Sequence, residues 1–117
     1  MDTEHRHTFY RVTKRNPPDA EFYLTNQDRF PEGQPDGLSE EGRLTWDAWS
    51  FYDSEENARK RGLESTHLGG KIVRFHIPEG RGITWEPPDD EGHVNVRGDK
   101  ERLEGCLDKA YVVKVRP

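Results

Sequence analysis

The sequence predicts an α+β domain whose main element is an antiparallel β-sheet with two or three short helices. Segments of strand and helix character follow the order β, α, β, α, β, β, β, α, β, which lacks the strict alternation of a parallel α/β sheet. The connections between the later strands are short, which favours antiparallel neighbours. A chain of 117 residues has the size of one domain. We therefore expect residues 1–117 to form a single unit, with a mobile N-terminus (1–7) and a mobile Gly- and Pro-rich loop at 32–43.

Composition limits both the core and the function. Only 30% of the residues are hydrophobic against 35% charged, so the three Trp, four Tyr and five Phe must supply most of the core. The net charge of −5 disfavours non-specific nucleic-acid binding, which depends on Lys and Arg neutralising phosphates. The lone Cys106 cannot form an internal disulfide or a Cys-rich zinc site. No apolar stretch is long enough for a membrane span or a signal peptide, so we expect a soluble, cytoplasmic protein without membrane partners.

The first half of the chain predicts two strands separated by polar turns. Residues 8–13 are aromatic and β-branched, and a weak helix with Asp19 as its cap is expected before the loop. Residues 46–52 form the second predicted strand. A helix follows it, with Asp53 as N-cap and Gly62 just past its end.

The second half of the chain predicts a cluster of short strands in which every other side chain faces the core. Residues 71–77, 83–85 and 93–97 read as strands, and the first and third alternate apolar with polar residues. A short helix is expected at 99–107, followed by a last strand at 111–115. The short links favour hairpin pairing of the three middle strands.

Cations and imidazoles occupy the polar faces of three predicted strands, at Arg11, Arg74, His76, His93 and Arg97. Guanidinium groups bind phosphate oxygens through paired hydrogen bonds, and imidazole can transfer a proton. If these faces converge, they would suit a phosphorylated ligand. The alternative is a half-exposed sheet whose outer face is merely polar.

Ser50 is a small hydroxyl between two large rings, Trp49 and Phe51. It either faces a ligand or forms a hydrogen bond to the backbone, and no nucleophile-elbow motif surrounds it. The acidic run at 86–91 shows no spacing typical of metal ligands and is more typical of a solvated turn. Cys106 is expected to act as a small hydrophobic residue. We expect no metal site.

The Tyr-Arg strand near the start, and the Trp-Ser-Phe strand followed at once by a capped helix, resemble the small ADP-ribosyltransferase-like fold. This resemblance concerns the order of elements over residues 8–115. It implies that Arg11 grips the ribose or phosphate of NAD, that Ser50 orients the ribose and that a late carboxylate is catalytic. The chain has no Glu-x-Glu pair, and Glu86 and Glu91 lie nearest the late strands.

Some relatives of this fold, the RNA 2′-phosphotransferases, use Arg and His side chains instead of Glu, and Arg74, His76, His93 and Arg97 would suit that variant. The resemblance thus implies NAD as cofactor and attack at the ribose anomeric carbon through an oxocarbenium-like transition state. It assigns catalysis to Ser50, Glu91 and His93, and ligand binding to Arg11, Trp49, Arg74, His76 and Arg97. Trp49 could stack on a base, although such a ring more often belongs to the core. The alternative function is a non-catalytic α+β module that binds another protein.

Overall fold

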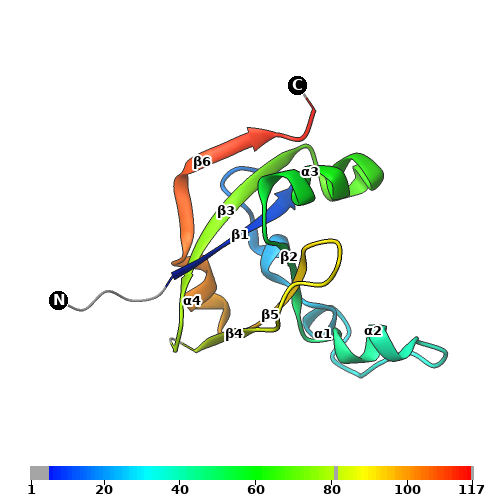
Figure 1. Ribbon diagram of the computed structural model, residues 1–117. Coiled ribbons are helices and arrows are strands. Elements are labelled where there is room, and N and C mark those ends of the chain that lie inside the picture. Colours follow the sequence, from blue (N-terminus) through cyan, green and yellow to red (C-terminus); the bar gives the residue numbers. More distant parts are fainter. Residues whose placement is uncertain (1–5, 81, 117) are drawn as a thin grey trace.

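A six-stranded antiparallel sheet forms the centre of the protein (Figure 1). The computed structural model describes residues 6–80 and 82–116. The strands are β1 (Arg6–Thr13), β2 (Trp49–Tyr52), β3 (Lys71–Pro78), β4 (Ile83–Trp85), β5 (His93–Gly98) and β6 (Leu107–Lys114). They lie in the order β4-β5-β2-β1-β3-β6, and each neighbouring pair is antiparallel. The predicted α+β class with a mainly antiparallel sheet is confirmed.

Short helices connect these strands, and the described residues hold more of them than the two or three predicted. They are the 3₁₀ helices η1 (Ala20–Tyr23) and η2 (Thr66–Leu68) and the α-helices α1 (Asn26–Arg29), α2 (Glu40–Leu44), α3 (Glu55–Glu64) and α4 (Lys100–Glu104). Thr25 and Asp28 form a capping box that starts α1. The Ser39 hydroxyl accepts a hydrogen bond from the N–H of Gly42 and so stabilises the first turn of α2. The prediction of a loop over residues 32–43 is therefore wrong at its C-terminal end, where α2 begins at Glu40.

The centre of the sheet is asymmetric around β1. On one side β1 pairs with β3 along all of its 8 residues. On the other side it pairs with β2 at a single position, Tyr10 opposite Tyr52. Beyond that position residues 11–13 and 49–51 have no mutual pairing. The two strands therefore separate on the side where Arg11 and Ser50 lie.

One face of the sheet carries the larger core cluster, which η1 and α4 cover through Tyr23 and Leu103. The buried members are Phe9, Tyr23, Trp49, Phe51, Val73, Phe75, Ile77, Ile83, Val94, Val96 and Leu103. Five of these eleven side chains are aromatic and six are aliphatic, so by number the rings do not supply most of this cluster, contrary to the expectation from composition. The inward positions predicted for β3 and β5 are confirmed, because alternate residues of a strand point to the same face.

The opposite face carries a smaller cluster of Val12, Ala58, Ile72 and Val115, covered by α3. Gly62 lies inside α3, which runs on to Glu64, so the predicted helix end at this glycine is wrong. A Cβ added to Gly62 would lie 2.9 Å from Cγ2 of Val115. Gly62 therefore allows close packing of the helix rather than ending it.

Helix α3 also begins one residue later than predicted. Ser54 is the N-cap, and its hydroxyl accepts a hydrogen bond from the N–H of Asn57. The carboxylate of Asp53, the predicted cap, instead accepts from the Asn57 side-chain amide at 2.8 Å. The sequence supplies two adjacent capping residues, and only the backbone path decides between them.

Three further boundaries differ from the prediction. Strand β2 starts at Trp49 rather than at 46, because the N–H of Ala48 closes a turn onto the carbonyl of Thr45. Helix α4 ends at Glu104, and β6 begins already at Leu107. The chain turns between them as the N–H of Cys106 donates to the carbonyl of Leu103. The predicted helix over 99–107 is too long for this reason.

One of the two hairpin pairings predicted among the three middle strands is confirmed, and the other is wrong. Strand β4 pairs with β5, as the short link predicts. Strand β3, however, lies between β1 and β6 and is not next to β4. Residues 1–5 of the terminus expected to be mobile lie outside the described residues, while Arg6 and His7 belong to β1. In the described part of the chain, no helix has the length and apolar character that crossing a membrane requires.

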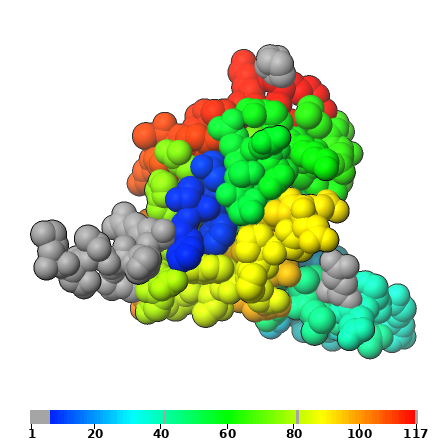
Figure 2. Space-filling model, in the orientation of Figure 1, coloured from blue at the N-terminus to red at the C-terminus, as the bar shows by residue number. Residues whose placement is uncertain are grey.

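The segment that holds α1 and α2 projects as a lobe from the body of the molecule (Figure 2). Trp46, two residues after α2, is buried, with its ring centroid 5.9 Å from that of Phe30. Phe30 is 49% exposed and Leu44 is 64% exposed. This lobe therefore presents apolar side chains to solvent.

Candidate functional site

A pocket of about 570 Å³ opens where β1 and β2 separate. Its walls come from β1, η1, α1, β2, α3, η2 and the loop before β5. The lining residues are Arg11, Val12, Thr13, Lys14, Asp19, Glu21, Phe22, Arg29, Ser50, Tyr52, Arg61, His67, Leu68, Asp89, Glu91 and His93. The volume lies in the range of small-molecule sites. The pocket combines cations, hydroxyls, carboxylates and aromatic rings within one cavity.

Arg11 lies on the core side of β1, two residues after the buried Phe9. Its Nη1 donates a 2.6 Å hydrogen bond to the carbonyl of Phe22. The guanidinium carbon stands 4.3 Å from the centroid of the Phe22 ring and 5.6 Å from that of Phe51. Burial, reinforced by the nearby charge of Arg29, lowers the pKa of Arg11 to about 10. The site therefore holds a cation in surroundings that disfavour its charge.

No carboxylate among residues 6–80 and 82–116 forms an ion pair with Arg11. Other partly buried arginines do have such partners: Arg74 lies 2.7 Å from Asp108, and Arg97 lies 2.9 Å from Asp47. A desolvated charge is normally paired, because the desolvation is otherwise uncompensated. Arg11 is thus an exception that an anionic ligand in the pocket would resolve.

Strand β2 contributes Ser50 and Tyr52, which share the face opposite to Trp49 and Phe51. The side chain of Ser50 is exposed, whereas that of Tyr52 is half-buried. Burial raises the pKa of Tyr52, so its hydroxyl keeps its proton and can donate a hydrogen bond. The ring of His93 packs edge-on against Tyr52 with 5.5 Å between the centroids. Two hydroxyls and an imidazole therefore line one wall.

Asp89 organises the loop that carries Glu91 and His93. Its Oδ1 accepts hydrogen bonds of 2.9 Å from the backbone N–H groups of both residues. Its Oδ2 lies 3.9 Å from Nδ1 of His93. These contacts, led by the His93 N–H, lower the pKa of Asp89. The position of two candidate catalytic side chains therefore depends on one carboxylate.

Gly92 fixes this loop against the start of α3. Its φ of +75° is the left-handed region that favours glycine, and an added Cβ would lie 2.3 Å from both Oδ1 of Asp53 and Nδ2 of Asn57. Its carbonyl accepts a 2.9 Å hydrogen bond from the N–H of Asp53. Figure 1 shows this loop, in yellow, passing close to α3.

Four of the residues singled out from the sequence meet in the pocket: Arg11, Ser50, Glu91 and His93. Trp49 does not, because it is 2% exposed in the core and donates its Nε1–H to the carbonyl of Tyr23 at 2.9 Å. Arg97 turns toward Asp47 and Glu86 at another surface, where hydrogen bonds with both carboxylates raise its pKa. Glu86 is thereby engaged outside the pocket.

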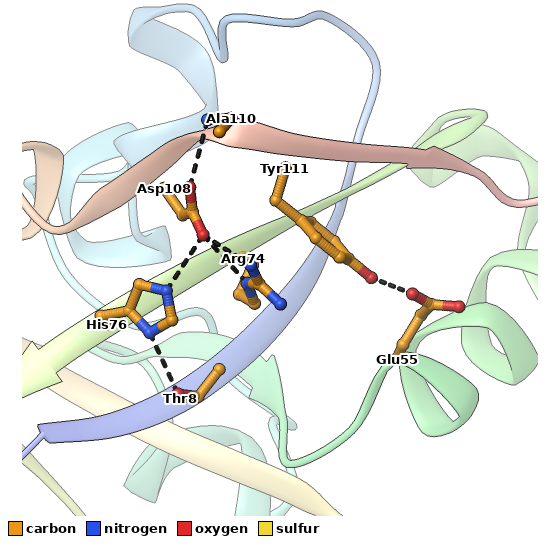
Figure 3. A network of polar contacts seen from close by, with 7 residues as sticks. All are labelled: Thr8, Glu55, Arg74, His76, Asp108, Ala110 and Tyr111. Atoms are coloured by element: carbon orange, nitrogen blue, oxygen red, sulfur yellow. Dashed lines mark hydrogen bonds and ion pairs between the residues drawn. The ribbon is translucent and has the colours of Figure 1, made fainter.

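Arg74 and His76 also lie outside the pocket, in a polar network between β3 and β6 (Figure 3). The same oxygen of Asp108 accepts from Nη2 of Arg74 at 2.7 Å and from Nε2 of His76 at 3.0 Å. Nδ1 of His76 lies 3.1 Å from the hydroxyl of Thr8 on β1. The bonds to Arg74 and then to His76 lower the pKa of Asp108 to about 2.

The same network continues to helix α3 through Tyr111. Its ring lies under the guanidinium of Arg74, 4.1 Å from centroid to carbon, and its hydroxyl donates to Glu55. Figure 3 shows these side chains linking three elements. The register of β3 and β6 shifts between Val73 and Phe75, so residues 108–111 bulge at this point. We therefore infer that the network stabilises the position of the bulged edge strand β6.

Several pocket residues escaped the sequence analysis. Tyr52 follows Ser50 at the strand period of two, so the alternation of residues 49–52 does contain that signal. Phe22 and Arg29 reach the pocket through tertiary packing of η1 and α1, which no local pattern reveals. The described residues contain no group of three or more His, Cys, Asp or Glu arranged to hold a metal ion.

The fold and site define an α+β domain with an anion-compatible pocket at a split in its sheet. No protein-family model, curated protein or solved structure matches the chain. The residues of the pocket themselves are therefore the basis for a functional proposal.

Proposed function

We propose that the pocket binds the ADP-ribose part of NAD and that the protein is an ADP-ribosyltransferase-like enzyme. The observation that carries the proposal is Arg11, a partly buried cation without an ion-pair partner among residues 6–80 and 82–116, which lines the same cavity as Ser50, Glu91 and His93. A guanidinium binds phosphate oxygens through paired, charge-assisted hydrogen bonds, and the pyrophosphate of NAD offers such oxygens. The resemblance in the order of elements supports the same ligand.

Each side chain has a role in this proposal. Arg11 binds a phosphate, and the hydroxyl of Ser50 orients the ribose. The bond between C1 of the ribose and the nicotinamide nitrogen breaks, and nicotinamide leaves with the electron pair. The carboxylate of Glu91 stabilises the positive charge that develops on the ribose. The nucleophile of the acceptor then attacks C1, and His93 accepts its proton.

The test is a thermal-shift titration with NAD, ADP-ribose and nicotinamide, together with an assay for released nicotinamide. A ligand at 100 times its Kd stabilises the native state by about 2.7 kcal/mol, so Tm should rise with dose. Arg11→Met should abolish the shift. Arg97→Met is the matched control, since it removes the same charge from a side chain outside the pocket, and it should leave the shift intact. The absence of a shift with wild-type protein at millimolar ligand would refute the proposal.

A second candidate, a module that binds another protein, is favoured by the exposed Leu44 and Phe30 on the projecting lobe. Leu44→Asp should then abolish capture of a partner, while Arg11→Met leaves it intact. The opposite pattern, with ligand binding lost only in Arg11→Met, supports the enzyme. The two candidates thus make different predictions for the same two variants.

A further inference from the structure

Asn95 contains a buried oxygen whose hydrogen-bonding capacity is unused. Its side-chain Oδ1 is shielded from solvent, and in the described part of the chain it has no hydrogen-bond partner. Asn95 lies on β5 directly opposite Ser50 on β2, and it shares its face with His93 two residues earlier. A buried acceptor without a hydrogen bond is rare in native proteins, so its presence at Asn95 has to be explained. Its position opposite Ser50, which lines the pocket, points to a functional explanation.

Ser50 is the natural donor for this oxygen. Directly opposed residues of an antiparallel pair have Cβ atoms roughly 4.5–5.5 Å apart, so a short hydroxyl and a short amide can meet. The Ser50 side chain lines the pocket, and residues 6–80 and 82–116 offer it no hydrogen bond. Its hydroxyl can take any of three staggered positions. The hydrogen bond between Ser50 and Asn95 therefore requires a χ1 rotamer that directs the hydroxyl toward Oδ1.

We propose that Asn95 is a positioning residue for Ser50. When a ligand occupies the pocket, the Ser50 hydroxyl donates a hydrogen bond to Oδ1 of Asn95. The lone pairs of Oγ then face the ligand. Ser50 thereby becomes an acceptor for an O–H or N–H group of the ligand, such as a ribose hydroxyl. Because the Asn95 side chain is neutral, it fixes the hydroxyl without adding a negative charge behind an anionic ligand. This inference rests on the proposed function.

The test is a double-mutant cycle on ADP-ribose affinity, measured by calorimetry. Ser50→Ala and Asn95→Leu should each weaken binding about tenfold, the value of one hydrogen bond. The double variant should also lose about tenfold rather than about a hundredfold, because the two residues act as a unit. A loss close to a hundredfold would overturn the inference.

Thermal stability without ligand separates positioning from a structural role. Leucine has the branched shape of asparagine, although its volume is larger, and it removes the unsatisfied oxygen, so Asn95→Leu should not lower Tm unless the larger side chain overpacks the site. A clear fall in Tm in both Asn95→Leu and the smaller Asn95→Ala would mean that the amide stabilises the fold itself, and the inference would be wrong. Asn95→Ala, which fits without overpacking, repeats the affinity measurement if the leucine variant does not fold.

The outcomes also separate this inference from the proposed function. If wild-type protein binds ADP-ribose and the Asn95 variants bind it equally well, Asn95 has no positioning role and the proposed function stands. If wild-type protein does not bind ADP-ribose at all, both the proposed function and the role of Asn95 are wrong.

Discussion

The backbone N–H of Asp53, at the junction of β2 and α3, donates a 2.9 Å hydrogen bond to the carbonyl of Gly92, in the loop before β5. This contact joins two segments far apart in the sequence, and both border the pocket. It ties the loop that carries Glu91 and His93 to the end of β2, the strand that carries Ser50. The arrangement of the candidate site thus depends on a residue that has no side chain.

Gly92→Ala is expected to destabilise the protein and to displace the loop. Left-handed backbone costs a residue with a Cβ about 1–2 kcal/mol, and here the Cβ would also clash with Asp53 and Asn57 at 2.3 Å. Gly80→Ala is the matched control, because its φ of +72° is similar but no atom lies within 4 Å of the added Cβ. Urea unfolding should show a larger loss in the free energy of unfolding for Gly92→Ala than for Gly80→Ala. Equal losses would mean that the loop adapts without cost.

Arg11→Met should leave Tm unchanged or raise it. The fold desolvates this guanidinium without giving it an ion-pair partner in the described part of the chain, and the lowered pKa of about 10 reflects that cost. Arg97→Met should lower Tm instead, since it leaves Asp47 and Glu86 without their common partner. Calorimetric scans of both variants measure the contrast. If Arg11→Met lowers Tm as much as Arg97→Met, Arg11 has a structural role.

Asp108→Asn should lower Tm at neutral pH but not in strong acid. The folded protein lowers the pKa of Asp108 from 3.8 to about 2, so the charged carboxylate stabilises the native state. That contribution is complete above the pKa of the unfolded chain and disappears as the pH falls through about 2. The difference in Tm between wild type and variant should therefore narrow from pH 5 downward. A constant difference across this range would contradict the assignment of Asp108 as the partner of Arg74 and His76.

Gly62→Ala should destabilise the protein, although alanine is the better helix former by roughly 1 kcal/mol. The new methyl group would meet Val115 at 2.9 Å, in the small core cluster between α3 and the sheet. Val115→Ala opens space at this contact, so the double variant should be more stable than the sum of the two single losses predicts. Guanidinium titration of the three variants measures the coupling. Purely additive losses would show that the contact is not tight.

The sequence reveals elements far better than it reveals their neighbours. Period-two alternation identifies β3 and β5 and their inward side chains, because burial on one face of a strand imposes that pattern. It does not reveal that Asp108, 34 residues from Arg74, accepts a hydrogen bond from its guanidinium. Local sequence therefore predicts a cationic ligand-binding face, whereas Asp108 of β6 pairs with Arg74 and His76.

The candidate site was predicted in part, and for a reason that differs from the expected one. Arg11 was expected to join the other cations on one polar face. It lies instead on the face of Phe9 and Phe51, while Ser50 lies on the other face. They line the same pocket because β1 and β2 pair at one position only. A break in strand pairing has no signature in local sequence, since strand pairing depends on contacts between segments far apart in the chain.

The single pairing position between Tyr10 and Tyr52 makes the middle of the sheet a seam. On one side stand β1, β3 and β6, which share an uninterrupted ladder between β1 and β3, and on the other stand β2, β5 and β4. A ligand that contacts both Arg11 and Ser50 would act as a clasp across this seam. Binding of such a ligand would then slow amide hydrogen exchange in both groups of strands, including at amides that the ligand does not contact.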